Sequence, residues 1–118
     1  MPHLIVELSQ GFEPSIEKGL LTKLNEGLFR SGEFTHSRDI KSRIHRADNS
    51  LIGLSADDGE LFVVAHLMIM SGRDDATKRS LVQSVLDTLV AHFTGQYDTV
   101  QFAVNLQELS PFYQKITV

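Results

Sequence analysis

The chain has 118 residues, 42% of them hydrophobic, which is typical of one globular domain. Its formal net charge of −4 argues against nucleic acid as a partner, and the lack of cysteine excludes disulfides and thiolate chemistry. The apolar start is interrupted by Glu7 without a preceding lysine or arginine, and no apolar run approaches the roughly 18 residues of a membrane span. We therefore expect a cytoplasmic protein without a secretory signal or membrane contact.

The first half of the chain predicts a strand, a helix and a second strand. Residues 4–8 are mostly apolar and are followed by turn-forming residues. Pro14 favours a first helical turn, and apolar residues then recur at helical spacing as far as Phe29, with Gly32 as the cap. Residues 39–47 alternate as in a half-buried strand. Its two faces carry Ile40, Ser42 and Ile44 on one side and Lys41, Arg43 and His45 on the other.

A polar, turn-rich segment over residues 48–59 separates the two halves. Its strongest break is Asp57-Asp58-Gly59. A long apolar strand is expected over residues 61–70. Ser71 and Asp74 then have the Ser-x-x-Asp form of a helix N-terminal cap. The second half therefore begins with a strand that leads into a helix, like the first.

The rest of the second half repeats the helix and the strand. Apolar spacing over residues 81–93 predicts an amphipathic helix that Gly95 closes. Residues 99–106 alternate again and predict a strand. The remaining tail carries Phe112 and Tyr113, which we expect to reach a neighbouring subunit rather than to line a pocket.

The order β-α-β thus occurs twice, which predicts an α+β fold in a single domain over residues 1–118. Its halves, residues 1–58 and 59–118, should each hold two parallel strands joined by a right-handed helical crossover. Together they would form a four-stranded mixed sheet with two helices on one face. The chain is too short to cover the other face, so apolar residues there predict an oligomer. The repeated helical stripe is Leu20, Leu24 and Leu28 in the first half and Leu81, Val85 and Leu89 in the second.

The Met1-Pro2 start suggests a catalytic base. A small second residue favours removal of the initiator methionine, which would leave Pro2 as a secondary amine with a pKa of roughly 8. Burial or a neighbouring cation would lower this pKa toward neutrality, where an amine can act as a general base. Because Met-Pro starts are common, the interpretation requires a substrate site formed by other residues.

Three basic residues are candidates for binding an anionic substrate. Arg73 follows a predicted strand and precedes a helix, where backbone N–H groups already favour anions. Its alternative role is a solvent-facing arginine paired with Asp74 or Asp75. Lys41 and Arg43 share one strand face, and their alternative role is a solvated surface. The five histidines lack zinc-site spacing, so we expect no metal site.

Three short segments, placed in this duplicated layout, carry a family resemblance. They are Met1-Pro2-His3-x-Ile5-Val6-Glu7, Ile40-Lys41-Ser42-Arg43-x-His45 and Gly72-Arg73. Together they resemble the tautomerase superfamily, and within it the 5-carboxymethyl-2-hydroxymuconate isomerases. The resemblance covers nearly the whole chain and becomes loose beyond Leu109.

The resemblance implies a homotrimeric isomerase that uses no metal and no organic cofactor. Pro2 would move a proton on a small unsaturated carboxylic acid from aromatic-compound breakdown, such as 5-carboxymethyl-2-hydroxymuconate. Arg73 stands at one of the family's two arginine positions, which bind substrate carboxylates. Lys41 stands at the other, where it keeps the charge but loses the two-pronged grip of arginine, and Arg43 would assist it.

Two alternatives stay open at this point. The same site could catalyse a phenylpyruvate-type keto–enol tautomerisation. The chain could instead be a non-catalytic, ligand-binding trimeric module in which the Met-Pro start has no role. A Pro2→Ala variant separates catalysis through Pro2 from the non-catalytic alternative, and a panel of enol and dienol substrates separates the two reactions.

Overall fold

The structure is a computed structural model that describes residues 1–54 and 59–118. The break predicted at Asp57-Asp58, and with it the boundary between the two halves, lies outside the described residues. The helices are α1 (Leu20–Arg30) and α2 (Asp75–Phe93), with short 3-10 helices η1 (Pro14–Glu17) and η2 (Ser37–Asp39). The strands are β1 (His3–Leu8), β2 (Lys41–Arg46), β3 (Leu61–Ile69) and β4 (Val100–Glu108).

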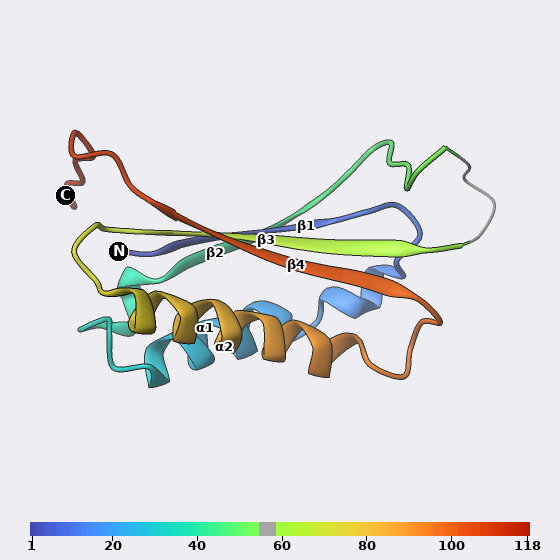
Figure 1. The fold of residues 1–118 in the computed structure, drawn as a ribbon, viewed down its shortest axis with the longest axis horizontal. Helices are drawn as coiled ribbons and strands as arrows, with labels where there is room; N and C mark the ends of the chain where they lie inside the picture. Colours follow the sequence, from blue (N-terminus) through green and yellow to red (C-terminus); the bar gives the residue numbers. More distant parts are fainter. Residues whose placement is uncertain (55–58) are drawn as a thin grey trace.

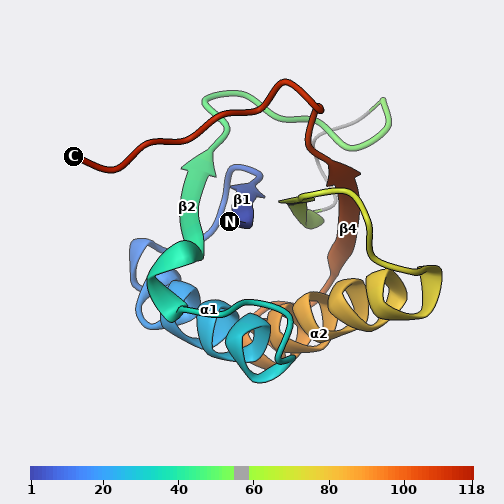
Figure 2. The same cartoon turned by 90° about the vertical axis from the view of Figure 1, so that its left-hand side faces the viewer.

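The four strands form one mixed sheet in the order β2-β1-β3-β4. Within each half the two strands are parallel, and the central pair β1 and β3 is antiparallel. Both helices cover the same face of this sheet (Figures 1 and 2). The predicted α+β fold, with a four-stranded mixed sheet and two helices on one face, is confirmed.

The core lies between the sheet and the helices, because strand residues alternate between the two faces and each helix presents one apolar stripe. On β1 the buried residues are Leu4, Val6 and Leu8, none of which is exposed. The two predicted helical stripes are also buried, which confirms them. On β4 the inward residues Val100, Phe102, Val104 and Leu106 pack against this core from the edge.

No helix of the described residues covers the other face of the sheet (Figure 1). This open face is less apolar than the sequence argument for an oligomer assumed, since basic, imidazole and amide side chains interrupt it. By strand alternation it carries Lys41, Arg43 and His45 from β2, His3, Ile5 and Glu7 from β1, Phe62, Val64, His66 and Met68 from β3, and Gln101, Ala103, Asn105 and Gln107 from β4.

The first helix is divided, whereas the sequence predicts one helix from Pro14 onward. Pro14 opens the short 3-10 helix η1, and α1 begins only at Leu20. Gly19 between them has φ +77°, a left-handed conformation that ends one helix and starts the next. A pattern of apolar residues alone does not reveal this break, because Ile16 of η1 is buried in the same core as α1.

The cap of the second helix differs from the predicted motif. Asp74 itself is the N-cap of α2, and its side chain accepts a hydrogen bond from the Thr77 backbone N–H at 2.8 Å. This bond lowers the pKa of the Asp74 carboxyl. Ser71 therefore lies before the helix as part of the connecting loop. The predicted motif identifies the helix start but assigns the cap to the wrong residue.

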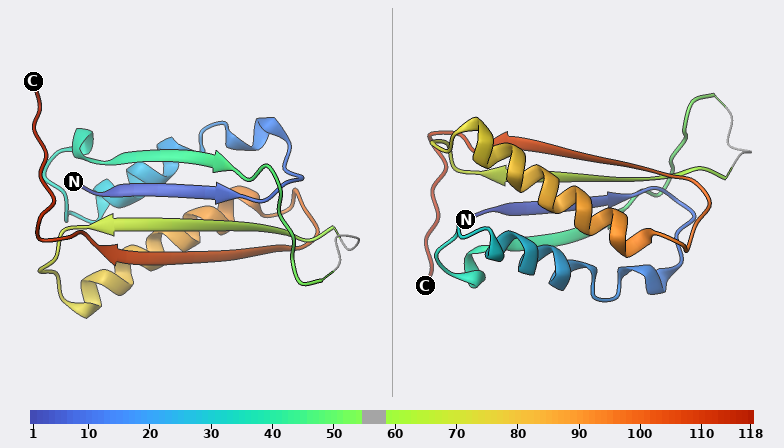
Figure 3. Two further views of the ribbon diagram at one scale, coloured as in Figure 1. Left: turned by 90° about the horizontal axis from the view of Figure 1, so that it is seen from above. Right: turned by 60° about the horizontal axis from the view of Figure 1, so that its bottom comes forward.

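The chain start and the C-terminal tail lie at the same end of the sheet (Figures 1 and 3). After β4, the Leu109 backbone N–H donates to the Ile69 carbonyl at 2.7 Å. The tail then crosses the sheet end near the start of β1 (Figure 3). No helix in the part of the chain that the structure describes is long and apolar enough to cross a membrane.

Candidate active site

Pro2 is buried at the beginning of β1, directly beside the first residue of β2. The Lys41 backbone N–H donates to the Pro2 carbonyl at 3.1 Å, and this bond begins the parallel pairing of the two strands. Partial burial lowers the pKa of the Met1 amine; Lys41, Lys115 and Arg73 lower that pKa further, and Asp39 opposes them. The environment at the chain start thus disfavours a protonated amine.

His3 connects this position to β2 and to the C-terminal tail. Its Nε2 lies 2.9 Å from the Tyr113 hydroxyl, and its Nδ1 lies 3.4 Å from Nη1 of Arg43. The Tyr113 hydroxyl in turn donates to Sδ of Met1 at 2.7 Å. Burial lowers the pKa of His3, and the positive charges of Arg43 and Lys41 lower it further, so the neutral imidazole is favoured.

Two lysines lie beside Asp39 at the same end of the sheet. Nζ of Lys41 donates to the Asp39 backbone carbonyl at 3.0 Å, and Nζ of Lys115 lies 3.9 Å from the Asp39 carboxylate. Partial desolvation lowers the pKa of Lys41, and Lys115 lowers it further. Two ammonium groups held this close form a site that an additional anion would stabilise.

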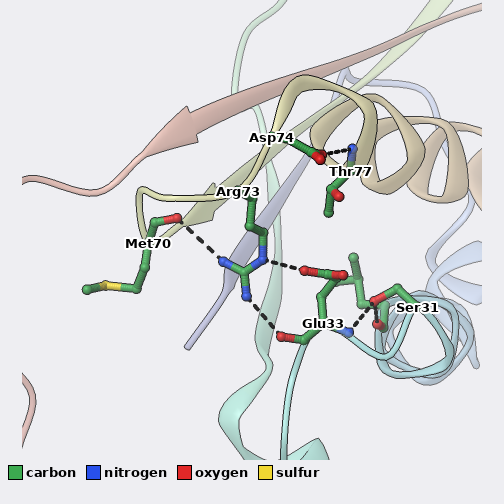
Figure 4. Close-up of polar contacts among 7 residues, drawn as sticks. Ser31, Glu33, Met70, Arg73, Asp74 and Thr77 are labelled. Atoms are coloured by element: carbon green, nitrogen blue, oxygen red, sulfur yellow. Dashed lines mark hydrogen bonds and ion pairs between the residues drawn. The ribbon is translucent and has the colours of Figure 1, made fainter.

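Arg73 reaches this end from the loop between β3 and α2, but its guanidinium is occupied (Figure 4). Nε lies 2.9 Å from the Glu33 carboxylate, and Nη2 donates to the Glu33 carbonyl at 2.9 Å. Nη1 reaches the Met70 carbonyl at 3.4 Å, and the Phe34 ring centroid is 5.0 Å from the guanidinium carbon. The alternative pairing of Arg73 with Asp74 or Asp75 is therefore replaced by a pairing with Glu33.

The structure brings the predicted site residues to one end of the sheet, but they differ in whether a carboxylate of the same chain already pairs with them. Pro2 immediately precedes β1 and accepts a hydrogen bond from Lys41 at the start of β2, while Arg43 lies two residues further along β2, opposite Ile5. Arg73 is close enough for its charge to act on the chain-start amine, but a carboxylate of the chain already holds it. His45 lies further along β2, opposite Glu7, and is exposed.

Sequence reasoning did not assign His3, Lys115 or Tyr113 to the site. The tail was expected to reach another subunit, yet Tyr113 contacts the start of its own chain. Phe112 beside it is 89% exposed and keeps the expected outward position. A signal for His3 was present, since it immediately follows Pro2 in the segment that carries the resemblance.

Residues 1–54 and 59–118 contain no group of three or more His, Asp or Glu side chains that could hold a metal ion. Away from the chain start, Nε2 of His92 contacts the Ile16 carbonyl, and Nδ1 of His92 lies 3.2 Å from Nζ of Lys23. These contacts join η1 and α1 to α2, so His92 has a structural role. The chain start thus combines an amine of lowered pKa with several cations, an arrangement suited to proton transfer on an anionic ligand.

Comparison with known proteins identifies the family of this chain. The model of the family described as 5-carboxymethyl-2-hydroxymuconate isomerase matches residues 2–117. No curated protein matches the chain in sequence.

Solved structures share the fold at low sequence identity. A 5-carboxymethyl-2-hydroxymuconate isomerase from Deinococcus radiodurans R1 is 24% identical, with a TM-score of 0.85, covering 98% of this chain and 90% of that one. A 5-carboxymethyl-2-hydroxymuconate delta-isomerase is 14% identical, with a TM-score of 0.83, covering 100% and 89%. A fused 4-OT, described as a wild-type symmetric trimer, is 16% identical, with a TM-score of 0.73, covering 97% and 90%.

Proposed function

Because this chain belongs to the 5-carboxymethyl-2-hydroxymuconate isomerase family, and is thus an isomerase of the tautomerase superfamily, we propose that it uses Pro2 as a proton-transferring base. The proposed substrate is a small unsaturated carboxylic acid such as 5-carboxymethyl-2-hydroxymuconate. The observation that carries the proposal is the position of Pro2, buried at the start of β1 among groups that lower the pKa of a chain-start amine. Removal of Met1 would give Pro2 that amine.

The proposed reaction moves one proton and changes no other atom. The free Pro2 amine accepts the proton of the 2-hydroxyl group, and the electrons of the conjugated diene shift to form the C2 carbonyl. The double bond moves to C3–C4, and the protonated Pro2 returns the proton to C5. An amine with a lowered pKa suits both steps, because it binds and releases the proton near neutral pH.

Cations of β2 and the tail are proposed to hold the substrate carboxylates. Lys41 and Arg43 stand on the same face of β2, and Lys115 lies beside Lys41. Their charges also stabilise the negative charge that develops on the substrate during proton transfer. Arg73 joins them only if a substrate carboxylate displaces Glu33 from its guanidinium.

The Pro2→Ala variant tests the base. Intact mass should first show that the wild-type chain lacks Met1. The variant should then lose about 100-fold or more of its isomerase turnover with 5-carboxymethyl-2-hydroxymuconate, the usual contribution of a positioned acid–base group. Pro14→Ala is the matched control, since Pro14 opens η1 at the other end of β1 and should leave turnover unchanged. Full turnover in Pro2→Ala would rule out the proposed mechanism.

A second reaction deserves the same assay because Arg73 is held by Glu33 and Lys41 lacks a two-pronged grip. Fewer free carboxylate clamps favour an enol with a single carboxylate, such as phenylpyruvate. Comparing kcat/KM for phenylpyruvate enol and for 5-carboxymethyl-2-hydroxymuconate in one preparation decides between them. A higher value for phenylpyruvate would reassign the substrate but keep the role of Pro2.

We propose a homotrimer as the active assembly. Support comes from the open sheet face and from the tail, where Phe112 is 89% and Ile116 is 86% exposed. Light scattering of the Phe112→Ala, Ile116→Ala double variant should show a loss of trimer at micromolar concentration. Phe29→Ala is the control, because Phe29 is partly exposed on α1, on the covered side of the sheet. A monomeric wild-type chain would contradict the proposal.

A further inference from the structure

Four groups form a continuous chain of polar contacts that ends at the side chain of Met1. Arg43 on β2 contacts His3 on β1 at 3.4 Å, and His3 contacts Tyr113 of the tail at 2.9 Å. The Tyr113 hydroxyl reaches Sδ of Met1 at 2.7 Å. The His3 and Tyr113 rings also pack edge to face, with centroids 5.9 Å apart, which fixes the phenol relative to β1.

The direction of every hydrogen bond in this chain follows from its first member. A guanidinium can only donate, so Nδ1 of His3 accepts from Arg43. A neutral imidazole then carries its proton on Nε2 and donates to the Tyr113 oxygen. The single hydroxyl proton of Tyr113 is left to point at Met1. The burial of His3 and the cations around it, which lower its pKa, favour the neutral imidazole that this arrangement needs.

We infer that Tyr113 is a catalytic residue whose hydroxyl donates a hydrogen bond to the substrate oxygen at C2, in the space that the Met1 side chain fills. This inference rests on the proposed function, since it requires a chain that starts at Pro2. Met1 precedes Pro2 directly, so the space that its side chain fills lies beside the Pro2 nitrogen. A substrate whose 2-hydroxyl group meets Pro2 therefore brings its C2 oxygen toward Tyr113.

The chemistry requires such a donor and transfers no proton through it. When Pro2 accepts the hydroxyl proton, the C2 oxygen carries negative charge until the carbonyl is formed and C5 is protonated. The Tyr113 proton stays on the phenol and stabilises this oxygen, as donors of an oxyanion hole do. The positive charge of Arg43 polarises His3 through their hydrogen bond, and this makes the Tyr113 hydroxyl a stronger hydrogen-bond donor. His3 is then a positioning residue, because it acts through Tyr113.

The Tyr113→Phe variant removes only the hydroxyl group. We expect kcat with 5-carboxymethyl-2-hydroxymuconate to fall about 100-fold, the low end of the usual loss when one oxyanion donor is removed, while KM changes less than about threefold. Tyr97→Phe is the matched control, since the Tyr97 hydroxyl accepts from the Glu13 backbone, away from the chain start. The substrate analogue 5-carboxymethylmuconate, which lacks the 2-hydroxyl group, should bind Tyr113→Phe and wild type equally.

Each outcome decides a separate point. A kcat within twofold of wild type in Tyr113→Phe would overturn the inference, and an inactive Pro2→Ala variant beside it would leave the proposed function standing. Equal losses of kcat and of affinity for 5-carboxymethylmuconate would also overturn it, because they would indicate packing of the tail. If Tyr113→Phe does not fold, His3→Leu provides the second test. It should lower kcat without weakening the binding of 5-carboxymethylmuconate. An unchanged kcat would refute the positioning of Tyr113 by His3.

Discussion

Replacing Glu33 with glutamine determines whether Arg73 binds substrate or only fastens two loops. In the structure the Arg73 guanidinium donates to both the carboxylate and the carbonyl of Glu33. Glutamine keeps an acceptor oxygen at nearly the same place and leaves the backbone carbonyl untouched. The variant therefore removes the negative charge that competes with a substrate carboxylate and changes little else.

The expected magnitude follows from the exposure of the pair. A charge-assisted hydrogen bond exceeds a neutral one by about 1 kcal/mol. The side chains of Arg73 and Glu33 are 21% and 34% exposed, so solvent screening reduces this difference to about 0.5–1 kcal/mol. The free energy of unfolding should fall by that amount. If substrate must displace Glu33, KM should fall about two- to fivefold, since about 1.4 kcal/mol corresponds to tenfold.

Steady-state kinetics and urea unfolding of Glu33→Gln measure the two quantities. Glu26→Gln is the matched control, because Glu26 pairs with Arg30 on α1 at 3.8 Å with both side chains more than half exposed. It should change neither KM nor stability measurably. An unchanged or higher KM in Glu33→Gln, together with lower stability, would refute substrate binding by Arg73. Its role would then be to stabilise the contact between the loop after β3 and the loop after α1.

Three further predictions concern the core residue Leu24, the imidazole of His3 and the ammonium group of Lys41. Leu24→Ala should lower the free energy of unfolding by about 2–5 kcal/mol in urea titrations, since Leu24 is 1% exposed; a loss below about 1 kcal/mol would contradict its core position. The lowered pKa of His3 means that the unfolded chain binds more protons below pH of about 6.5, so stability should fall as pH drops from there toward the folded pKa. His3→Gln should lose that part of the pH dependence, and an unchanged slope between pH 7.5 and 5.5 would oppose the assignment. Lys41→Arg should lower KM for a dicarboxylate by restoring a two-pronged grip, and a raised KM would exclude carboxylate binding there.

Local sequence patterns predicted the sheet and helices because each depends on neighbours in the sequence. Alternation along β2 places Lys41 and Arg43 together on one face of the strand. Helical spacing places Leu81, Val85 and Leu89 together on the buried face of α2. These patterns are repeated in both halves, so the duplicated layout followed from them. The break at Gly19 escaped this reasoning, since a left-handed glycine leaves the apolar spacing on either side intact.

The partners of the site residues could not be predicted, because they come from distant loops. The contact of Arg73 with Glu33 joins the loop after β3 to the loop after α1. The contact of Tyr113 with His3 joins the two ends of the chain. Neither pair has a spacing rule, since both depend on how the loops leave the sheet. Charge alone suggested Asp74 and Asp75 as neighbours for Arg73, and three-dimensional proximity favoured Glu33 instead.

The strand directions explain why these groups meet at one end of the sheet and not at the other. β1 and β2 are parallel, so both start there and place Pro2 beside Lys41. β3 runs antiparallel to β1, so β3 and β4 both end there, and the loop with Arg73 and the tail with Tyr113 leave from the same place. The first half thus contributes strand starts and the second half contributes strand ends.

The opposite end of the sheet has the reverse arrangement and different chemistry. There β3 and β4 start, and Nε2 of Gln101 donates to the Glu60 carboxylate at 3.0 Å. An acidic group at that place opposes the binding of a carboxylate. Although the fold is duplicated, the two ends of the sheet differ, and within residues 1–54 and 59–118 the end that begins with Pro2 combines the chain-start amine with several cations. We therefore propose one proton-transfer site per chain, at the end that begins with Pro2. Variants at Glu60 or Gln101 should leave turnover unchanged, while Pro2→Ala should lower it about 100-fold or more.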